Sequence, residues 1–196
     1  MDISEGLKFP MKDKDWTKKV LIGGLLNIVP IVNFISFGYA LETMKLITNK
    51  NQTLPEWDEF GSKFVKGLVG AVISMTYLII PSIIMLALMF VNKTVGLIIG
   101  FILIIISGFI IPMALANYVA KDSFGAAFEF GEIISRIKSV IGEYIICYIV
   151  LIVLYLIVGV ISMIPIIGWI IGAILGFYVQ LVYAYYFGNL YAKSKL

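Results

Sequence analysis

The chain contains no histidine and only one cysteine among its 196 residues. Histidine is the commonest proton shuttle and metal ligand of proteins. The one cysteine, Cys147, lies in an apolar run, where a thiol behaves as a small hydrophobic group. These absences exclude a disulfide within the chain, zinc sites and histidine-ligated haem. We expect no catalytic residue, no metal, no cofactor and no nucleic-acid partner.

Charge is also absent from long parts of the sequence. The four charge-free stretches lie between Lys19 and Glu42, Lys66 and Lys93, Lys93 and Lys121, and Glu143 and Lys193. A helix needs ~20 apolar residues to cross a ~30 Å hydrocarbon layer, so each stretch could cross once and the last twice. With 61% hydrophobic residues and a mean hydropathy of +1.02, the sequence predicts an all-α integral membrane protein. Residues 1–196 would form a single membrane domain.

The basic residues predict the topology. If residues 20–41 crossed the membrane once, 6 of the 15 basic residues would face one side and 9 the other. If this stretch enters and returns as a helical hairpin, 14 share one side and only Lys93 faces away. Because cytoplasmic loops are enriched in lysine and arginine, we predict the hairpin, with both termini cytoplasmic and the protein in the cytoplasmic membrane.

Residues at the centre of the first stretch favour this hairpin. Pro30 has no backbone N–H and disfavours helix at the residue before it. Asn27 and Asn33 flank Pro30 and are suited to capping helix ends. The short arms leave open whether the hairpin spans the membrane or is re-entrant, and one proline-kinked span is the alternative. Pro165 lies in a similar turn, so the sequence predicts six membrane segments in three helical hairpins.

A motif with the pattern Asp-x-Phe-Gly-x-x-Phe precedes two of these hairpins, at residues 58–64 and 122–128. Around each copy, apolar and charged residues separate onto opposite faces of an expected helix, including a Glu132–Arg136 pair. We predict amphipathic helices in the membrane interface. The motif residues are Trp57, Asp58, Phe60, Gly61, Phe64, Asp122, Phe124, Gly125 and Phe128.

The two motif copies indicate an internal repeat. Each unit would be an interfacial helix followed by a hairpin, and the N-terminal part resembles a shorter third copy. The units are approximately residues 1–50, 51–121 and 122–196. Because every unit begins on the same side, the repeats are parallel and not inverted.

Small residues recur at steps of four or eight along the last helix of each clear repeat. This spacing lets helices approach closely in lipid. Gln180 interrupts the pattern, and we interpret it as an interhelical hydrogen bond, within the chain or at a homo-oligomer interface. A residue that lines a pore or holds a substrate is the alternative. The packing seam comprises Gly96, Gly100, Gly108, Gly168, Gly172, Gly176, Gln180, Ala184 and Gly188.

The remaining charged residues give little support for catalysis. Glu42 and Lys45 lie one helical turn apart, and we expect them to pair near the inner interface. Glu56, Asp58 and Glu59 cluster at an expected helix start, where acids favour the helix dipole. We do not expect an enzyme.

Residues 30–39, 54–61 and 64–68 resemble the DUF4013 family, and the run Leu-Pro-Glu-Trp-Asp-x-Phe-Gly at 54–61 is the most specific part. These are multi-pass membrane proteins of unknown function found mainly in archaea. The resemblance implies an archaeal cytoplasmic membrane and supplies no catalytic residues.

We therefore predict a non-enzymatic membrane component that oligomerises or organises lipid through its interfacial helices. Its candidate partners are membrane lipids, whose anionic headgroups a basic inner face attracts, and further copies of the chain. The alternative is a small channel or transporter with a cavity lined by Gln180, Asn27 and Asn33.

Overall fold

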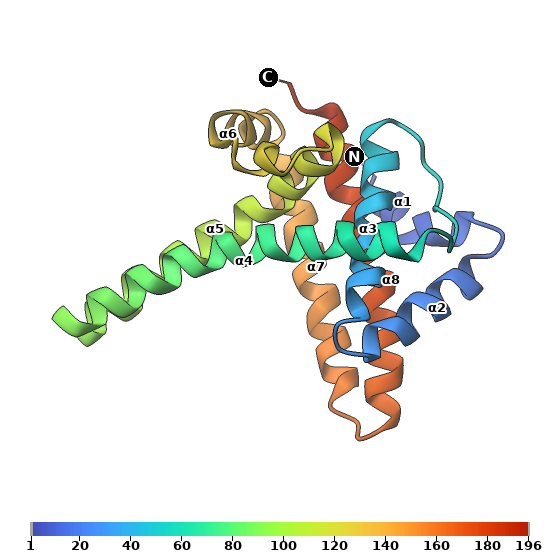
Figure 1. The fold of residues 1–196 in the computed structure, drawn as a ribbon, viewed down its shortest axis with the longest axis horizontal. Coiled ribbons are helices and arrows are strands. Elements are labelled where there is room, and N and C mark those ends of the chain that lie inside the picture. The colour runs from blue at the N-terminus through green and yellow to red at the C-terminus, as the bar shows by residue number, and fades with distance from the viewer. Residues whose placement is uncertain (1, 196) are drawn as a thin grey trace.

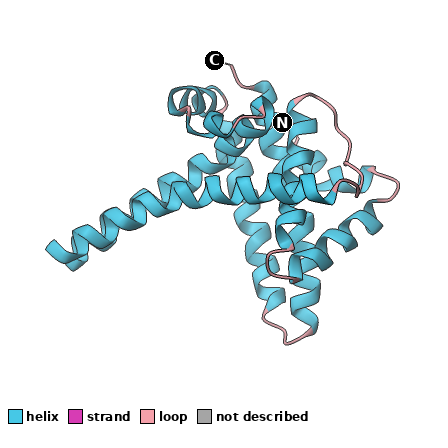
Figure 2. Ribbon diagram, viewed as in Figure 1, coloured by secondary structure: helices cyan, strands magenta, loops and turns pink. Residues whose placement is uncertain are grey.

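A computed structural model describes residues 2–195, and every regular element in this range is a helix (Figures 1 and 2). In chain order these are α1 (Ile3–Lys8), the 3₁₀ helix η1 (Phe9–Lys12), α2 (Trp16–Ile28), α3 (Asn33–Thr48), α4 (Phe60–Val91), α5 (Lys93–Lys121), the 3₁₀ helix η2 (Phe124–Phe128), α6 (Phe130–Ser139), α7 (Ile141–Ser162) and α8 (Ile167–Lys193).

Four helices, α4, α5, α7 and α8, are long and apolar enough to cross a membrane. The all-α prediction is therefore confirmed, with four candidate spans. Helices α2 and α3 have 13 and 16 residues. At 1.5 Å per residue they are about 20 and 24 Å long, shorter than a ~30 Å hydrocarbon layer. The six segments expected from the sequence are thus four long helices and two short ones.

The break between α2 and α3 contains Pro30. Ile31, which follows it, has φ 72°, a conformation that β-branched residues rarely adopt. The N-cap of α3 is Val32, with no side-chain hydrogen bond, and the buried Oδ1 of Asn33 has no partner among residues 2–195. Asn27 lies inside α2, before its C-cap Val29. The predicted capping by these asparagines is therefore wrong, because the proline turn itself separates the helices.

The turn between α7 and α8 has the same Pro-Ile step. Ile166 has φ 64° and ψ −67°, and the Ile167 N–H donates to the Pro165 carbonyl at 2.7 Å. These values describe a γ-turn with a positive φ, which is rare and strained. Both turns therefore place an isoleucine in a left-handed conformation directly after a proline.

The centre of the fold is α8, which packs against α2, α3 and α7. Its C-terminal half is almost wholly buried, and the N-terminal segment covers part of it. The ring of Phe9 lies 4.8 Å from that of Tyr185, and the Tyr186 hydroxyl donates to the Ile3 carbonyl at 2.8 Å. Both termini lie near α6, at the end of the molecule opposite the α7–α8 turn (Figure 1).

The two long hairpins diverge. In Figure 1, α4 and α5 extend together to the left of the body, whereas α7 and α8 extend downward. Helix α4 packs mainly against α3 and α5. The outer part of the α4–α5 hairpin is exposed, up to Phe90 at its end. The chain therefore forms two apolar arms that separate from a shared base, and not one parallel bundle.

The two motif copies fold differently. Residues 51–59 are not helical, and α4 runs without interruption from Phe60 to Val91. The amphipathic helix predicted over residues 55–64 is therefore wrong for residues 55–59, because contacts with α2 and α3 hold residues 54–58 out of a helix, whereas residues 60–64 are helical as the start of α4. In the second copy, η2 and the separate helix α6 precede α7. Asp122 ends α5 with φ 49°.

Candidate functional site

Ion pairs join the start of α2, the end of α3 and the start of α4. Lys19 on α2 is 3% exposed, and its Nζ donates to Asp13 Oδ2 at 2.9 Å and to Glu56 Oε1 at 2.6 Å. Burial alone lowers the pKa of Lys19, but the hydrogen bonds to Glu56 and Asp13 outweigh it and raise the pKa above 10.5. The buried ammonium is therefore charged at neutral pH.

A second buried lysine lies on α4. Lys63 is 1% exposed, and its Nζ donates to Asp58 Oδ1 at 2.9 Å and to the Asp58 carbonyl at 2.8 Å. The hydrogen bond from Lys63 holds the pKa of the Asp58 carboxyl below its usual value. Glu42 Oε2 lies 3.4 Å from Lys63 Nζ and 3.7 Å from Lys66 Nζ. Two lysines of α4 thus share Glu42.

The predicted pair between Glu42 and Lys45 is wrong. The α3–α4 crossing brings Lys63 and Lys66 to Glu42, whereas Lys45 pairs with Asp122 at the end of α5. Helix α3 is therefore linked to α4 on one side and to the end of α5 on the other.

Trp57 lies between the two buried lysines. Its ring stacks on Tyr39 with centroids 4.1 Å apart, and its Nε1 donates to the Lys19 carbonyl at 3.0 Å. The Tyr39 hydroxyl donates to the Pro55 carbonyl at 2.7 Å. The segment of residues 54–58 thus contacts α2, α3 and α4 and links the three helices.

This arrangement is suited to stabilising the fold and not to acid–base chemistry. Glu56 and Asp58 are held by different lysines, and Glu59 is the left-handed N-cap of α4 with φ 43°. Within residues 2–195, no group of three or more His, Cys, Asp or Glu side chains could hold a metal ion.

Residues around the second motif copy link α6 to α5 and α8. The buried Asn117 donates to the Ala126 carbonyl at 2.8 Å and accepts from the Tyr191 hydroxyl at 2.8 Å. The predicted Glu132–Arg136 pair is present at 2.9 Å, and the Arg136 guanidinium lies 4.2 Å from the centre of the Tyr191 ring.

Glu132 also accepts from Lys121 at 2.6 Å. Burial raises the pKa of Glu132, but the hydrogen bonds from Lys121 and Arg136 outweigh it and lower the pKa below 4.5. Phe128 stacks on Tyr77 with centroids 5.6 Å apart, while Phe124 and Phe60 are largely exposed. In the first copy, Phe64 contacts Phe34 of α3.

Most small residues of the predicted seam lie at helix contacts within the chain. A Cβ at Gly100 would lie 2.2 Å from Met85, one at Gly172 would lie 2.0 Å from Ser162, and one at Gly188 would lie 3.0 Å from Ile47. Gly96 and Gly168 are similarly close to the preceding helix, and Ala184 is buried. These residues therefore bring α5 onto α4, and α8 onto α7 and α3.

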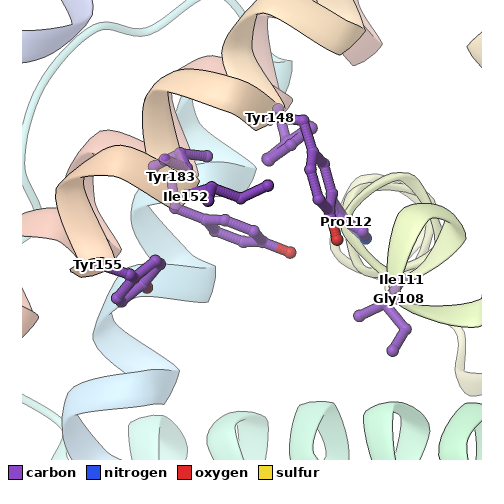
Figure 3. A pocket seen from close by; sticks show the side chains of 9 residues that line it. Gly108, Ile111, Pro112, Tyr148, Ile152, Tyr155 and Tyr183 are labelled. Atoms are coloured by element: carbon purple, nitrogen blue, oxygen red, sulfur yellow. The ribbon is translucent and has the colours of Figure 1, made fainter. Parts of the chain in front are cut away.

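Gly108 and Gly176 differ from the others. A Cβ at Gly176 would meet nothing within 4 Å, and one at Gly108 would meet only the Tyr148 hydroxyl, at 3.6 Å. Gly108 borders a cavity of about 200 Å³ between α5, α7 and α8 (Figure 3). Tyr183 extends its ring from α8 toward α5, and Tyr148 reaches from α7 to Pro112 (Figure 3).

Gln180 lines an adjoining cavity of about 210 Å³ together with residues of α3, α4, α5, α7 and α8. Its Oε1 is buried and has no hydrogen-bond partner within the described chain. Within the described chain, this oxygen therefore lacks the interhelical hydrogen bond predicted for Gln180, and the version at a homo-oligomer interface stays a prediction. Asn27 and Asn33 are not among the residues that line this cavity, so the structure does not bring the three predicted polar residues together.

The sequence did not reveal the role of the N-terminal segment. The Tyr178 hydroxyl donates to the Leu7 carbonyl at 2.6 Å, and a Cβ at Gly6 would overlap the Tyr186 ring. The density of tyrosines near the end of α8 was the available signal, but it does not identify their partners.

The chain has the features of a helical membrane protein, with four helices that are long and apolar enough to span a membrane and whose apolar surfaces are exposed. The chain belongs to the family described as "Protein of unknown function (DUF4013)", whose model matches residues 22–185. It is similar to an uncharacterized protein of Methanocaldococcus jannaschii, with 28% identity over 151 residues, 70% of this chain and 52% of the relative. The chain thus spans about half the length of this curated relative. No solved structure matches it.

Proposed function

We propose that this chain is a non-enzymatic, multi-pass protein of the cytoplasmic membrane that organises anionic lipid at its inner face, with both termini cytoplasmic. The observation that carries the proposal is an excess of free basic side chains at one end of the molecule. Anionic headgroups attract such side chains by about 1 kcal/mol each.

The excess arises because nine of the 12 acidic residues are held in ion pairs, and only Asp2, Asp15 and Glu59 form none within residues 2–195. Six exposed lysines form no ion pair within residues 2–195, whereas the other basic residues except Lys93 are held by carboxylates. The six are Lys8, Lys14, Lys18, Lys50, Lys138 and Lys195. Four of them belong to α1, α6 and the ends of α3 and α8, which lie where both termini lie (Figure 1).

Three other interpretations receive less support. The small residues that suggested an oligomer interface are mostly occupied by contacts within the chain. A channel lined by Gln180, Asn27 and Asn33 is not favoured, since the cavity at Gln180 includes neither asparagine. An enzyme is not favoured at the clustered carboxylates, since Asp13, Glu56, Glu42 and Asp58 are each paired with Lys19 or Lys63.

Native mass spectrometry of the purified protein with retained lipids tests the proposal. The wild type is expected to retain anionic lipid in preference to neutral lipid. The variant K8Q/K50Q/K138Q/K195Q is expected to retain at least about tenfold less anionic lipid. Lys93→Gln, at the α4–α5 turn, is the matched control and is expected to behave as the wild type. Equal retention of both lipid classes by the wild type, or unchanged retention of anionic lipid by the quadruple variant, would overturn the proposal.

A further inference from the structure

The divergence of the two long hairpins leaves a space at their base. The cavity beside Gly108 and the cavity beside Gln180 share Ile111, Tyr155 and Tyr183. We refer to the two together as the tyrosine cavity. The part beside Gly108 lies between α5 on one side and α7 and α8 on the other (Figure 3), and the part beside Gln180 is also lined by α3 and α4.

Four polar side chains of the tyrosine cavity lack partners within residues 2–195, whereas Ser74 donates to the Gly70 carbonyl at 2.9 Å. Gln180 Oε1 is buried without a hydrogen bond, and the hydroxyls of Tyr148, Tyr155 and Tyr183 form none within the described residues. Elsewhere, tyrosines at helix contacts donate to carbonyls, as Tyr144 does to Phe109 at 2.6 Å. An unpaired buried polar group such as Gln180 Oε1 costs about 1–3 kcal/mol, so this oxygen is suited to a bound partner, and the three hydroxyls are free to bond to the same molecule.

The walls restrict the chemistry of that partner. No charged side chain lines the tyrosine cavity, and its other lining residues are apolar except Ser74. A charged ligand would lose its hydration without gaining a counter-ion. Gln180 Oε1 requires a donor, while a tyrosine hydroxyl can donate or accept. An uncharged, mainly apolar molecule with a hydroxyl group satisfies both.

The cavity is open on the lipid-facing side of α7. Ile152 and Tyr155 line it and remain 48% and 45% exposed. Both lie within a helix long and apolar enough to span a membrane. A ligand can therefore reach the tyrosine cavity from the hydrocarbon layer with its chain lying along the exposed apolar face.

We propose that the tyrosine cavity between α5, α7 and α8 binds a membrane-soluble alcohol, whose hydroxyl bonds to Gln180 and Tyr183 and whose hydrocarbon chain extends between the diverging hairpins. No lysine lines this site, and its residues differ from those of the basic surface beyond the C-terminal end of α8, so the two proposals can fail independently.

Photo-crosslinking of the full chain in lipid nanodiscs tests this site. The probe is 1-dodecanol with a diazirine on its chain, and the cross-linked peptides are mapped by mass spectrometry. Cross-links are expected within residues 148–155 and 180–187. Unlabelled dodecanol should compete, whereas dodecane and dodecanoate should compete at least about fivefold less well, since one lost hydrogen bond costs about 1 kcal/mol.

Three variants sharpen the test. Gln180→Leu is expected to weaken competition by dodecanol about fivefold to tenfold. Gly108→Leu fills the cavity from a position where a Cβ meets only the Tyr148 hydroxyl, and is expected to abolish the cross-links. Tyr178→Phe removes a hydroxyl on α8 outside the cavity and serves as the control, with unchanged cross-linking.

Two outcomes would overturn the proposal. One is cross-links spread evenly over the lipid-facing helices. The other is equal competition by dodecane and dodecanol in the wild type, with Gln180→Leu unchanged. If Gly108→Leu fails to fold, Gln180→Leu together with the dodecane comparison decides the question.

Discussion

At the scale of single residues, the closest helix contact depends on two glycines. A Cβ at Gly67 of α4 would lie 1.9 Å from the Phe34 carbonyl oxygen, and one at Gly38 of α3 would lie 1.7 Å from the Lys63 carbonyl oxygen. This approach brings the Lys63 side chain of α4 to Glu42 of α3. The ion pairs at the base of the hairpins therefore rest on the absence of side chains at the crossing.

Gly67→Ala is expected to lower the free energy of unfolding by about 1–3 kcal/mol, because backbone atoms must move apart to admit the methyl group. Gly61→Ala is the matched control on the same helix. Its Cβ would meet nothing within 4 Å, so the better helix propensity of alanine should stabilise by up to about 1 kcal/mol. Thermal unfolding in detergent measures both. Equal effects of the two substitutions would contradict the α3–α4 crossing.

At the scale of elements, predictions of helices and breaks from the sequence were correct where a local property of the sequence determines the structure. Charge-free stretches identified the long helices, and Pro30 located the break between α2 and α3. Predictions from local patterns were wrong where contacts between residues distant in the sequence determine the structure. Residues 55–59 have the pattern of an amphipathic helix, yet Tyr39 and Lys19 hold Trp57 and its neighbours out of a helix.

The backbone of the α7–α8 turn is strained at Ile166, and a substitution can test this strain. Ile166 has φ 64° and is 71% exposed, so little packing compensates for its conformation. Ile166→Gly is expected to stabilise the protein by about 1 kcal/mol, because glycine adopts positive φ without steric cost. Ile164→Gly, in the same turn but with ordinary φ, should not stabilise. The difference in melting temperature between the two variants is the measurement. A lower stability for Ile166→Gly would show that this turn is not strained.

At the scale of the whole molecule, the lengths of the long helices agree with the different directions of the two long hairpins. Helix α7 has 22 residues and is about 33 Å long, close to a ~30 Å hydrocarbon layer. Helices α4 and α5 have 32 and 29 residues, about 48 and 44 Å, and fit the same layer only when tilted. The α4–α5 hairpin does run in a different direction from α7–α8 in Figure 1. Charge-free stretches alone could not reveal this divergence, because it depends on how α3 and α8 pack at the base.

The candidate site was only partly predictable for the same reason. Gln180 stood out in the sequence as the polar residue in a small-residue pattern. The tyrosines that share its cavity come from α7 and α8, and only the tertiary arrangement sets them opposite Gly108 of α5. In the sequence, Lys19 and Lys63 resemble other lysines expected at the membrane interface. Their burial could not be predicted, because it depends on how residues 54–58 pack against them.

The central claim is that the chain returns to its starting side after α2 and α3 and crosses through the long hairpins. Cysteine accessibility tests it most directly, in a background where the buried Cys147 is replaced by serine. Single cysteines are placed at the exposed positions Ser4, Gln52 and Thr94. The account predicts that positions 4 and 52 react with a membrane-impermeant reagent from one side only, the cytoplasmic side, and position 94 only from the other. Labelling of positions 4 and 52 from opposite sides would contradict it.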